Sequence, residues 1–234
     1  MKQSPVPHTP YTQPDPTVRI RLFRGFIIPF FRVLYHILSR PIVEGSHNIP
    51  KHGSYLITVN HLSYYDPPLA LAFWPCRPEV LGAASQMARP IIGHIMRWYG
   101  THPVRRDTSS SDFLVVRLAL TILQSGQPLL IMPEGRRNPD GLGQAQLGAA
   151  YLATKANVPI VPVGITGTEN MISSLLRGRR QVLRMIIGKP YHLPSLEGSN
   201  RKQALQACTD LIMQRIAQHL PETYRGKYPI STHQ

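Results

Sequence analysis

Short apolar runs of strand length alternate with helical stretches along most of this chain of 234 residues, and this alternation restricts its fold more than any other feature. The expected strands are apolar and partly β-branched, and they cover Tyr55–Val59, Leu129–Met132, Ile160–Val163 and Val182–Ile187. The expected helices cover Asp112–Leu123, Leu147–Ala156 and Arg201–Leu220. Strands that alternate with helices predict an α/β sheet covered on both faces.

The length of the chain allows one sizeable core, so we expect a single main domain over residues 41–220. Residues 1–16 are rich in proline and nearly free of aliphatic side chains, which predicts a disordered tail. Residues 221–234 are expected to form a loose C-terminal tail. Both ends are therefore predicted to lie outside the folded core.

Residues 17–40 combine aromatic, aliphatic and basic side chains to an extent that is unusual for a soluble helix. Pro29 interrupts the segment, and its uncharged runs fall short of the roughly 18 apolar residues that a transmembrane helix needs. We expect an amphipathic helical segment in the membrane interface, with its arginines on lipid phosphates. The alternative is a first helix packed on the domain core, because apolar periodicity marks burial of any kind.

The balance of charge points to polyanionic partners, because 26 lysines and arginines outnumber 12 acidic residues and give a formal net charge of +14. Nucleic acid, anionic lipid headgroups and phosphorylated substrates all fit this charge. We expect no nucleic acid, since zinc-finger spacing and RNA-recognition signatures are missing from the sequence. Cys76 and Cys208 are too few for a disulfide framework, and no metal-ligand spacing is present, so we expect a reducing cytoplasmic setting and no metal.

The stretch Asn60–Asp66 follows an expected strand and carries a histidine and an aspartate five positions apart. On a continuous helix that spacing turns the two side chains about 140° apart, so they meet only if the chain bends between them. Pro67 and Pro68 favour such a bend, at the start of a helix capped by Asp66. His61 is then a candidate general base oriented by Asp66, and the alternative is a structural histidine beside an aspartate that only caps a helix.

Three further segments carry groups suited to ligand binding. Gly100–Arg106 is a glycine turn that leads to paired arginines, and Met132–Asn138 places a carboxylate beside a glycine and two guanidiniums. Val158–Val163 is an apolar strand bracketed by prolines, with Pro162 expected where a neighbouring ligand or chain takes the hydrogen bonds.

With these segments, the chain resembles the glycerolipid acyltransferase family, that of the 1-acyl-glycerol-3-phosphate acyltransferases. The four motifs of that family read N-H-x4-D, G-x-x-x-V-x-R, P-E-G-x-R and V-P-[IV]-V-P, and all four occur in this order between Asn60 and Val163. The resemblance implies a single α/β domain with a mixed central sheet flanked by helices. From the basic, amphipathic segment of residues 17–40 and the expected reducing setting, we predict peripheral, monotopic membrane association at the cytoplasmic face.

The resemblance further implies the chemistry of the site. His61 would deprotonate the free sn-2 hydroxyl of 1-acyl-glycerol-3-phosphate, which attacks an acyl thioester of coenzyme A or acyl carrier protein and gives phosphatidic acid. No cofactor is needed beyond that co-substrate. Arg106 and Arg137 would bind the acceptor phosphate, Glu134 would hold Arg137 or the acceptor's glycerol, and Gly135 would let the backbone approach a ligand. Motif positions with a possible auxiliary role are Asn60, Gly100, Val104, Arg136 and Pro162.

Two departures from the family pattern concern the acceptor. Arg136 stands where the family usually has a small hydroxyl residue, and Ala145–Leu147 stands where a lysine often precedes the glycine that corresponds to Gly148. The first alternative is therefore an acyltransferase for a different lysolipid or a phosphate-free hydroxyl. A catalytically silent lipid-binding relative is another alternative, and a basic nucleic-acid-binding protein is a remote one.

Overall fold

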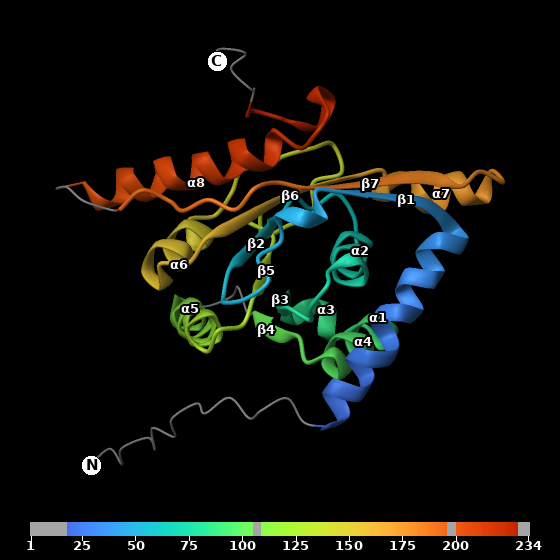
Figure 1. Ribbon diagram of the computed structural model, residues 1–234, viewed down its shortest axis with the longest axis horizontal. Helices are drawn as coiled ribbons and strands as arrows, with labels where there is room; N and C mark the ends of the chain where they lie inside the picture. The colour runs from blue at the N-terminus through green and yellow to red at the C-terminus, as the bar shows by residue number, and fades with distance from the viewer. Residues whose placement is uncertain (1–17, 105–108, 196–199, 229–234) are drawn as a thin grey trace.

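The computed structural model describes residues 18–104, 109–195 and 200–228, which form a mixed sheet between two layers of helices (Figure 1). The sheet has seven strands in the order β1-β7-β6-β2-β5-β3-β4. The strands are β1 (Ser39–Glu44), β2 (Leu56–Val59), β3 (Glu79–Ala83), β4 (His102–Val104), β5 (Leu129–Ile131), β6 (Ile160–Thr166) and β7 (Gln181–Ile187). Neighbouring strands are parallel except for β6 and β7, which are antiparallel. The predicted α/β fold with a mixed sheet is confirmed.

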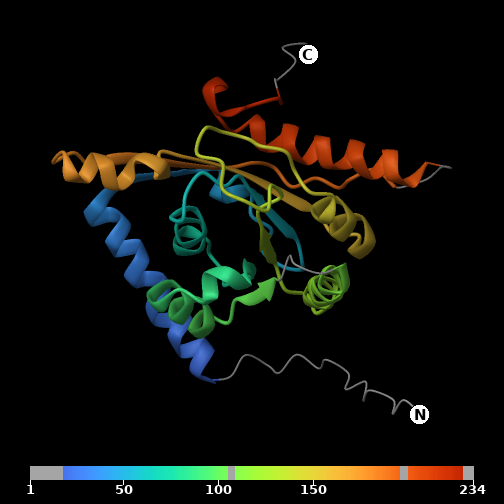
Figure 2. The ribbon, with the colours of Figure 1, turned by 180° about the vertical axis from the view of Figure 1, so that it is seen from behind.

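Helices flank the sheet on both of its faces. The helices are α1 (Val18–Leu38), α2 (Asp66–Phe73), α3 (Ala84–Met87), α4 (Pro90–Tyr99), α5 (Ser109–Gln124), α6 (Gly148–Ala156), α7 (Met171–Leu176) and α8 (Arg201–Ala217). Three single-turn helices are η1 (Ser46–Asn48), η2 (Thr168–Asn170) and η3 (Glu222–Tyr224). Helices α5, α6 and α8 cover one face of the sheet, and α1 and α2 cover the other (Figures 1 and 2).

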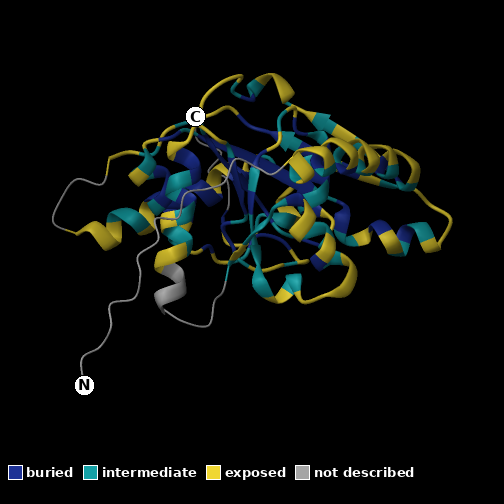
Figure 3. Ribbon diagram, turned by 90° about the horizontal axis from the view of Figure 1, so that it is seen from below, coloured by how far each residue is buried: buried dark blue, intermediate teal, exposed yellow. Residues whose placement is uncertain are grey.

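The two cores arise from the alternation of side chains along the strands. In β2, Leu56 joins the core under α5, α6 and α8, whereas Ile57 joins the core under α1 and α2. The central strands β2, β5 and β6 are buried along almost their whole length, so Figure 3 shows dark blue strands inside an outer layer of exposed helix surfaces. Strands buried on both faces read as continuous apolar runs, which is why these three were predictable.

The first helix lies along one side of the molecule and packs against α2, α4 and β1 (Figures 1 and 2). Ile27 and Tyr35 bury one face of α1 against the domain. The opposite face exposes a stripe of apolar side chains at Val18, Leu22, Phe26, Phe30, Val33 and Ile37. Among the described residues, no helix has both the length and the apolar content to cross a bilayer.

The structure differs from expectation near the C-terminus, where residues 221–228 pack on the domain. The backbone N–H of Leu142 donates to the Tyr224 carbonyl at 2.8 Å, and the Tyr224 hydroxyl donates to Glu169 at 2.8 Å. Tyr228 is buried in the core under α8. The expected loose tail is therefore wrong for residues 221–228, because two tyrosines find partners there. Residues 229–234 and the expected tail of residues 1–16 lie outside the described residues.

Candidate active site

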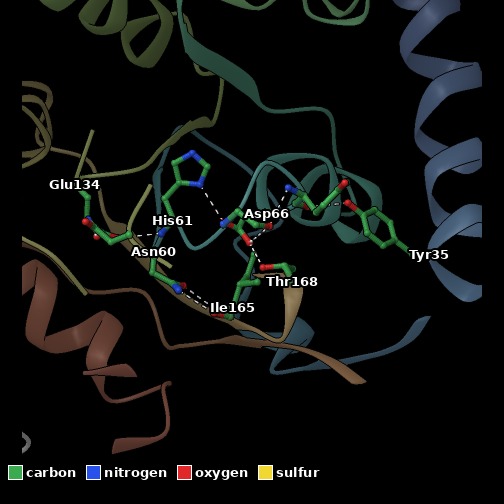
Figure 4. A network of polar contacts seen from close by, with 10 residues as sticks. Tyr35, Asn60, His61, Asp66, Glu134, Ile165 and Thr168 are labelled. Atoms are coloured by element: carbon green, nitrogen blue, oxygen red, sulfur yellow. Dashed lines mark hydrogen bonds and ion pairs between the residues drawn. The ribbon is translucent and has the colours of Figure 1, made fainter. Parts of the chain in front are cut away.

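A histidine and an aspartate meet in the loop between β2 and α2 (Figure 4). His61 Nδ1 lies 3.0 Å from Asp66 Oδ2, and the chain bends so that α2 begins at Asp66 with Pro67 and Pro68 in its first turn. An ionised carboxylate only accepts hydrogen bonds, so Nδ1 carries the proton in this contact and Nε2 is left as the acceptor. The predicted bend and the predicted contact are both present.

The carboxylate of Asp66 is fully buried and held by donors on two sides. The backbone N–H of Ser63 donates to Oδ2 at 2.7 Å, and the Thr168 hydroxyl donates to Oδ1. The expected cap is wrong, because Tyr65 occupies the N-cap position of α2 and the Asp66 side chain turns back to His61 and Ser63. These contacts fix the carboxylate that orients His61.

Asn60 ties the start of this loop to β6. Its side-chain amide donates to the Ile165 carbonyl at 2.8 Å and accepts from the Ile165 N–H at 2.7 Å (Figure 4). The amide thus continues the pairing of β2 with β6 beyond Val59. Asn60 is buried, and its two hydrogen bonds to β6 hold the backbone just before His61 in place.

Glu134 holds the same backbone from the opposite side. Only 2% of Glu134 is exposed; its Oε1 accepts the His61 N–H at 3.0 Å, and its Oε2 accepts the Gly143 N–H at 2.8 Å and the Asn138 amide. Burial raises the pKa of Glu134, although the hydrogen bonds from Gly143, Asn138 and His61 oppose that rise. The expectation that Glu134 holds Arg137 is wrong, because both carboxylate oxygens are engaged elsewhere.

The loop after β5 brings Arg137 next to the histidine loop. Gly135 adopts a left-handed φ of 67° and its N–H donates to the Met132 carbonyl at 2.9 Å, so the turn itself requires glycine. Arg137 is exposed, and its Nη2 donates to the Tyr64 hydroxyl at 2.9 Å. Arg136 is also exposed.

The second motif is described only as far as Val104, at the end of β4. Gly100 ends α4 with a left-handed φ of 83°. The register of β4 with β3, and of β3 with β5, brings the end of β4 to the same edge of the sheet as the loop after β5. Arg106 lies outside the described residues, so its predicted phosphate contact stays a prediction.

The strand that carries the fourth motif has its backbone hydrogen bonds satisfied by the chain itself. The Pro162 carbonyl accepts the Gly188 N–H at 2.8 Å, and Ile160 exchanges two backbone hydrogen bonds with Tyr191. The protein's own segment Gly188–Tyr191 therefore occupies the place where a neighbouring ligand or chain was expected.

Sequence reasoning missed several residues that shape the site. Thr168 is buried and contacts Asp66 across 102 positions of sequence, so no local spacing could reveal the pair. Asn138 donates its backbone N–H to the His61 carbonyl at 2.7 Å, which completes the connection between the two loops. Tyr64 lies within the first motif, at a position to which the motif assigns no role.

Known proteins are similar to this chain over the region that contains the site residues described above. Residues 40–166 match the sequence profile of the family described as Acyltransferase. The chain is 28% identical to the chloroplastic 1-acyl-sn-glycerol-3-phosphate acyltransferase LPAT1 of Arabidopsis thaliana, over 71% of this chain and 45% of that protein. It is 29% identical to the 1-acyl-sn-glycerol-3-phosphate acyltransferase of Borreliella burgdorferi, over 55% of this chain and 52% of that protein. The chain thus spans about half the length of these curated relatives.

A solved structure is also similar. The 1-acyl-sn-glycerophosphate (LPA) acyltransferase PlsC from Thermotoga maritima matches with a TM-score of 0.60 and 25% identity, over 82% of this chain and 79% of that chain. The similarity extends beyond the matched motifs to the arrangement of the sheet and helices.

Proposed function

This chain belongs to the acyltransferase family, and on that premise we propose that it transfers a fatty acyl group from an acyl thioester to the sn-2 hydroxyl of 1-acyl-glycerol-3-phosphate. The names of the relatives and the four ordered motifs support the acceptor. One observation carries the mechanism: His61 Nδ1 lies 3.0 Å from a fully buried Asp66 carboxylate. The donor is an acyl thioester of coenzyme A or acyl carrier protein.

In the proposed reaction, Nε2 of His61 takes the proton of the acceptor hydroxyl as its oxygen attacks the thioester carbonyl. The tetrahedral intermediate collapses, the carbon–sulfur bond breaks, and the leaving thiolate takes the proton back from the imidazolium. Asp66 stabilises the imidazolium between these steps and keeps Nδ1 protonated. The ester and the free thiol are the products, and His61 is regenerated.

Replacing His61 with alanine tests this assignment. General-base catalysis contributes roughly 10²- to 10⁴-fold, so we expect thiol release from acyl-CoA in the presence of lysophosphatidic acid to fall by at least about a hundredfold. His192→Ala, at an exposed histidine outside the motifs, serves as the matched control. Near-normal turnover of His61→Ala would refute the general-base role.

The same assay separates the alternative acceptors. Lysophosphatidic acid is compared with other lysolipids and with a phosphate-free monoacylglycerol under identical conditions. Product from the phosphate-free acceptor alone would contradict a phosphate-binding role for Arg106 and Arg137. Product from no acceptor would favour a catalytically silent lipid-binding protein.

We also propose that residues 17–40 attach the protein peripherally to anionic membranes, with the exposed stripe of α1 in the interface. The apolar residues of the stripe recur every three or four positions and so share one face of the helix. The opposite face packs on the domain through Ile27 and Tyr35, so the two interpretations of the sequence describe two faces of one helix. Phe26→Ser combined with Val33→Ser should weaken flotation with phosphatidylglycerol vesicles, whereas Phe113→Ser, at an exposed position of α5, should not. Unchanged flotation of the double variant would contradict this role of α1.

A further inference from the structure

Three segments that are distant in sequence meet at the ring of Tyr64, in the loop that carries His61 and Asp66. From the loop after β5, the guanidinium carbon of Arg137 lies 3.6 Å from the centroid of the Tyr64 ring. From the two-residue link between α3 and α4, the guanidinium carbon of Arg89 lies 5.1 Å from the same centroid. Arg89 belongs to none of the four motifs, so only the fold brings it here.

The two guanidiniums form a concentration of positive charge on one ring. Because both lie on one ring, they are separated by less than about a Debye length at 0.1 M salt, roughly 10 Å, and repel each other. Within the described ranges, neither Arg89 nor Arg137 forms an ion pair with an acidic side chain. The ring and the Tyr64 hydroxyl hold the arginines in place without neutralising them. An anion bound by both would remove the repulsion.

The chemistry of such an anion follows from the donors. Guanidinium groups match the oxygens of a phosphate with parallel, charge-assisted hydrogen bonds. Two guanidiniums suit a phosphomonoester, which carries close to two negative charges at neutral pH.

The position of the site favours the phosphate of the acceptor over those of the donor. In 1-acyl-glycerol-3-phosphate, the phosphate is on the carbon next to the one that bears the reacting hydroxyl. In acyl-CoA, the long pantetheine arm separates the phosphates from the thioester. Tyr64 is three residues from His61, and the loop of Arg137 is joined to the His61 carbonyl through the Asn138 N–H at 2.7 Å. The Tyr64 ring and Arg137 thus belong to the two loops that are joined at the His61 backbone.

We propose that Arg89, which shares the Tyr64 ring with the motif residue Arg137, is a further residue that binds the phosphomonoester of the acceptor and determines acceptor specificity. The identity of the acceptor rests on the proposed function, whereas binding of the anion does not. Arg89 is exposed, so its replacement should leave folding intact.

The kinetic test uses Arg89→Gln, which removes the charge and keeps a polar side chain. Because the variant loses a charge-assisted hydrogen bond to the phosphate, we expect the KM for lysophosphatidic acid to rise about tenfold or more with little change in kcat. The KM for acyl-CoA and turnover of any phosphate-free acceptor should not change. Arg117→Gln, at an exposed arginine of α5, is the matched control. Tyr64→Phe keeps the ring and should have a smaller effect than Tyr64→Leu.

A binding test separates this proposal from the proposed function. Calorimetric titration of the full-length His61→Ala protein with a short-chain, monomeric lysophosphatidic acid should give binding that Arg89→Gln weakens about tenfold. This result would support the anion site even if the wild-type protein acylated no acceptor. An unchanged acceptor affinity and KM in Arg89→Gln would overturn the proposal. So would a rise in the KM for acyl-CoA instead, or a loss limited to binding of anionic vesicles, since these outcomes assign the arginines to the donor or to the bilayer.

Discussion

Replacing Glu134 with glutamine distinguishes a residue that positions His61 from one that binds the acceptor. In the wild-type protein, Oε1 accepts one donor, the His61 N–H, whereas Oε2 accepts two, from Gly143 and Asn138. A glutamine keeps the most hydrogen bonds by directing its oxygen towards the two donors. Its NH₂ group then faces the His61 N–H, so the contact that holds the histidine backbone is the one lost.

The expected magnitude follows from burial. Glu134 is 2% exposed, so water cannot replace the lost acceptor, and an unpaired buried donor costs about 1–3 kcal/mol. We expect Glu134→Gln to lower the free energy of unfolding by about 2 kcal/mol. Glu222→Gln is the matched control, because Glu222 is exposed and its change should stay within about 0.5 kcal/mol.

Urea unfolding and steady-state kinetics on the same preparations provide the measurement. The acceptor KM should stay within about threefold of the wild-type value while kcat falls about tenfold, since displacement of His61 by a fraction of an ångström impairs proton transfer. The opposite pattern, a tenfold rise in KM with an unfolding free energy within about 0.5 kcal/mol of wild type, would refute the positioning role. It would show instead that Glu134 contacts the acceptor.

Three further predictions concern the scaffold of the site. Burial opposes ionisation of Glu79, but hydrogen bonds from His102 and Arg24 prevail and lower the pKa of Glu79 to about 2. The ionised Glu79 should therefore contribute fully to the free energy of unfolding above pH 4.5, and that free energy should decline by a few kcal/mol as the pH falls towards 2. Glu79→Gln should flatten this decline when urea unfolding is repeated across that pH range. Gly45→Ala should lower the free energy of unfolding by more than about 2 kcal/mol, because Gly45 has a φ of 76° and an added Cβ would meet the Ile187 carbonyl. Gly53→Ala is the control: Gly53 has a φ of 82° but open space around it, so the loss should be only about 1 kcal/mol. Equal losses in the two variants would contradict the steric argument. Thr168→Val should lower kcat about tenfold at constant KM by removing the donor to Asp66, with Thr168→Ser retaining activity; an unchanged kcat would show that this donor is dispensable.

The parts of the fold that the sequence predicted are those in which local pattern and burial agree. The strands β2, β5 and β6 were predicted because they are apolar along their length, and α1 was predicted over nearly its whole extent. The sequence did not predict β1, β3 or β4. In β1, exposed residues alternate with buried or half-buried ones around a proline, and β4 has only three residues. The strand character of both therefore comes from pairing with β7 and β3.

The contacts of the candidate site also differ in how far the sequence could predict them. His61 and Asp66 were predictable because five positions and two prolines confine them to one loop. The resemblance implied that Glu134 holds Arg137, three positions along the chain, or the acceptor's glycerol, yet its partner His61 is 73 positions away. The contact of Arg89 with Tyr64 likewise depends on how α3 and α4 pack beside the loop. Spacing predicts contacts within a loop, whereas contacts between loops need the sheet that positions them.

The loop with His61 is finally connected to the helix that we propose to meet the membrane. The buried hydroxyl of Tyr35, in α1, donates to the Tyr65 carbonyl at 2.7 Å, one residue before Asp66 (Figure 4). Tyr35 leaves the exposed stripe of α1 free, because it lies on the opposite face of the helix. The helix proposed to meet the bilayer and the loop proposed for catalysis are therefore connected through the side chain of Tyr35. If α1 meets the membrane as we propose, an acceptor that enters from the bilayer would reach the loop of His61 beside that helix.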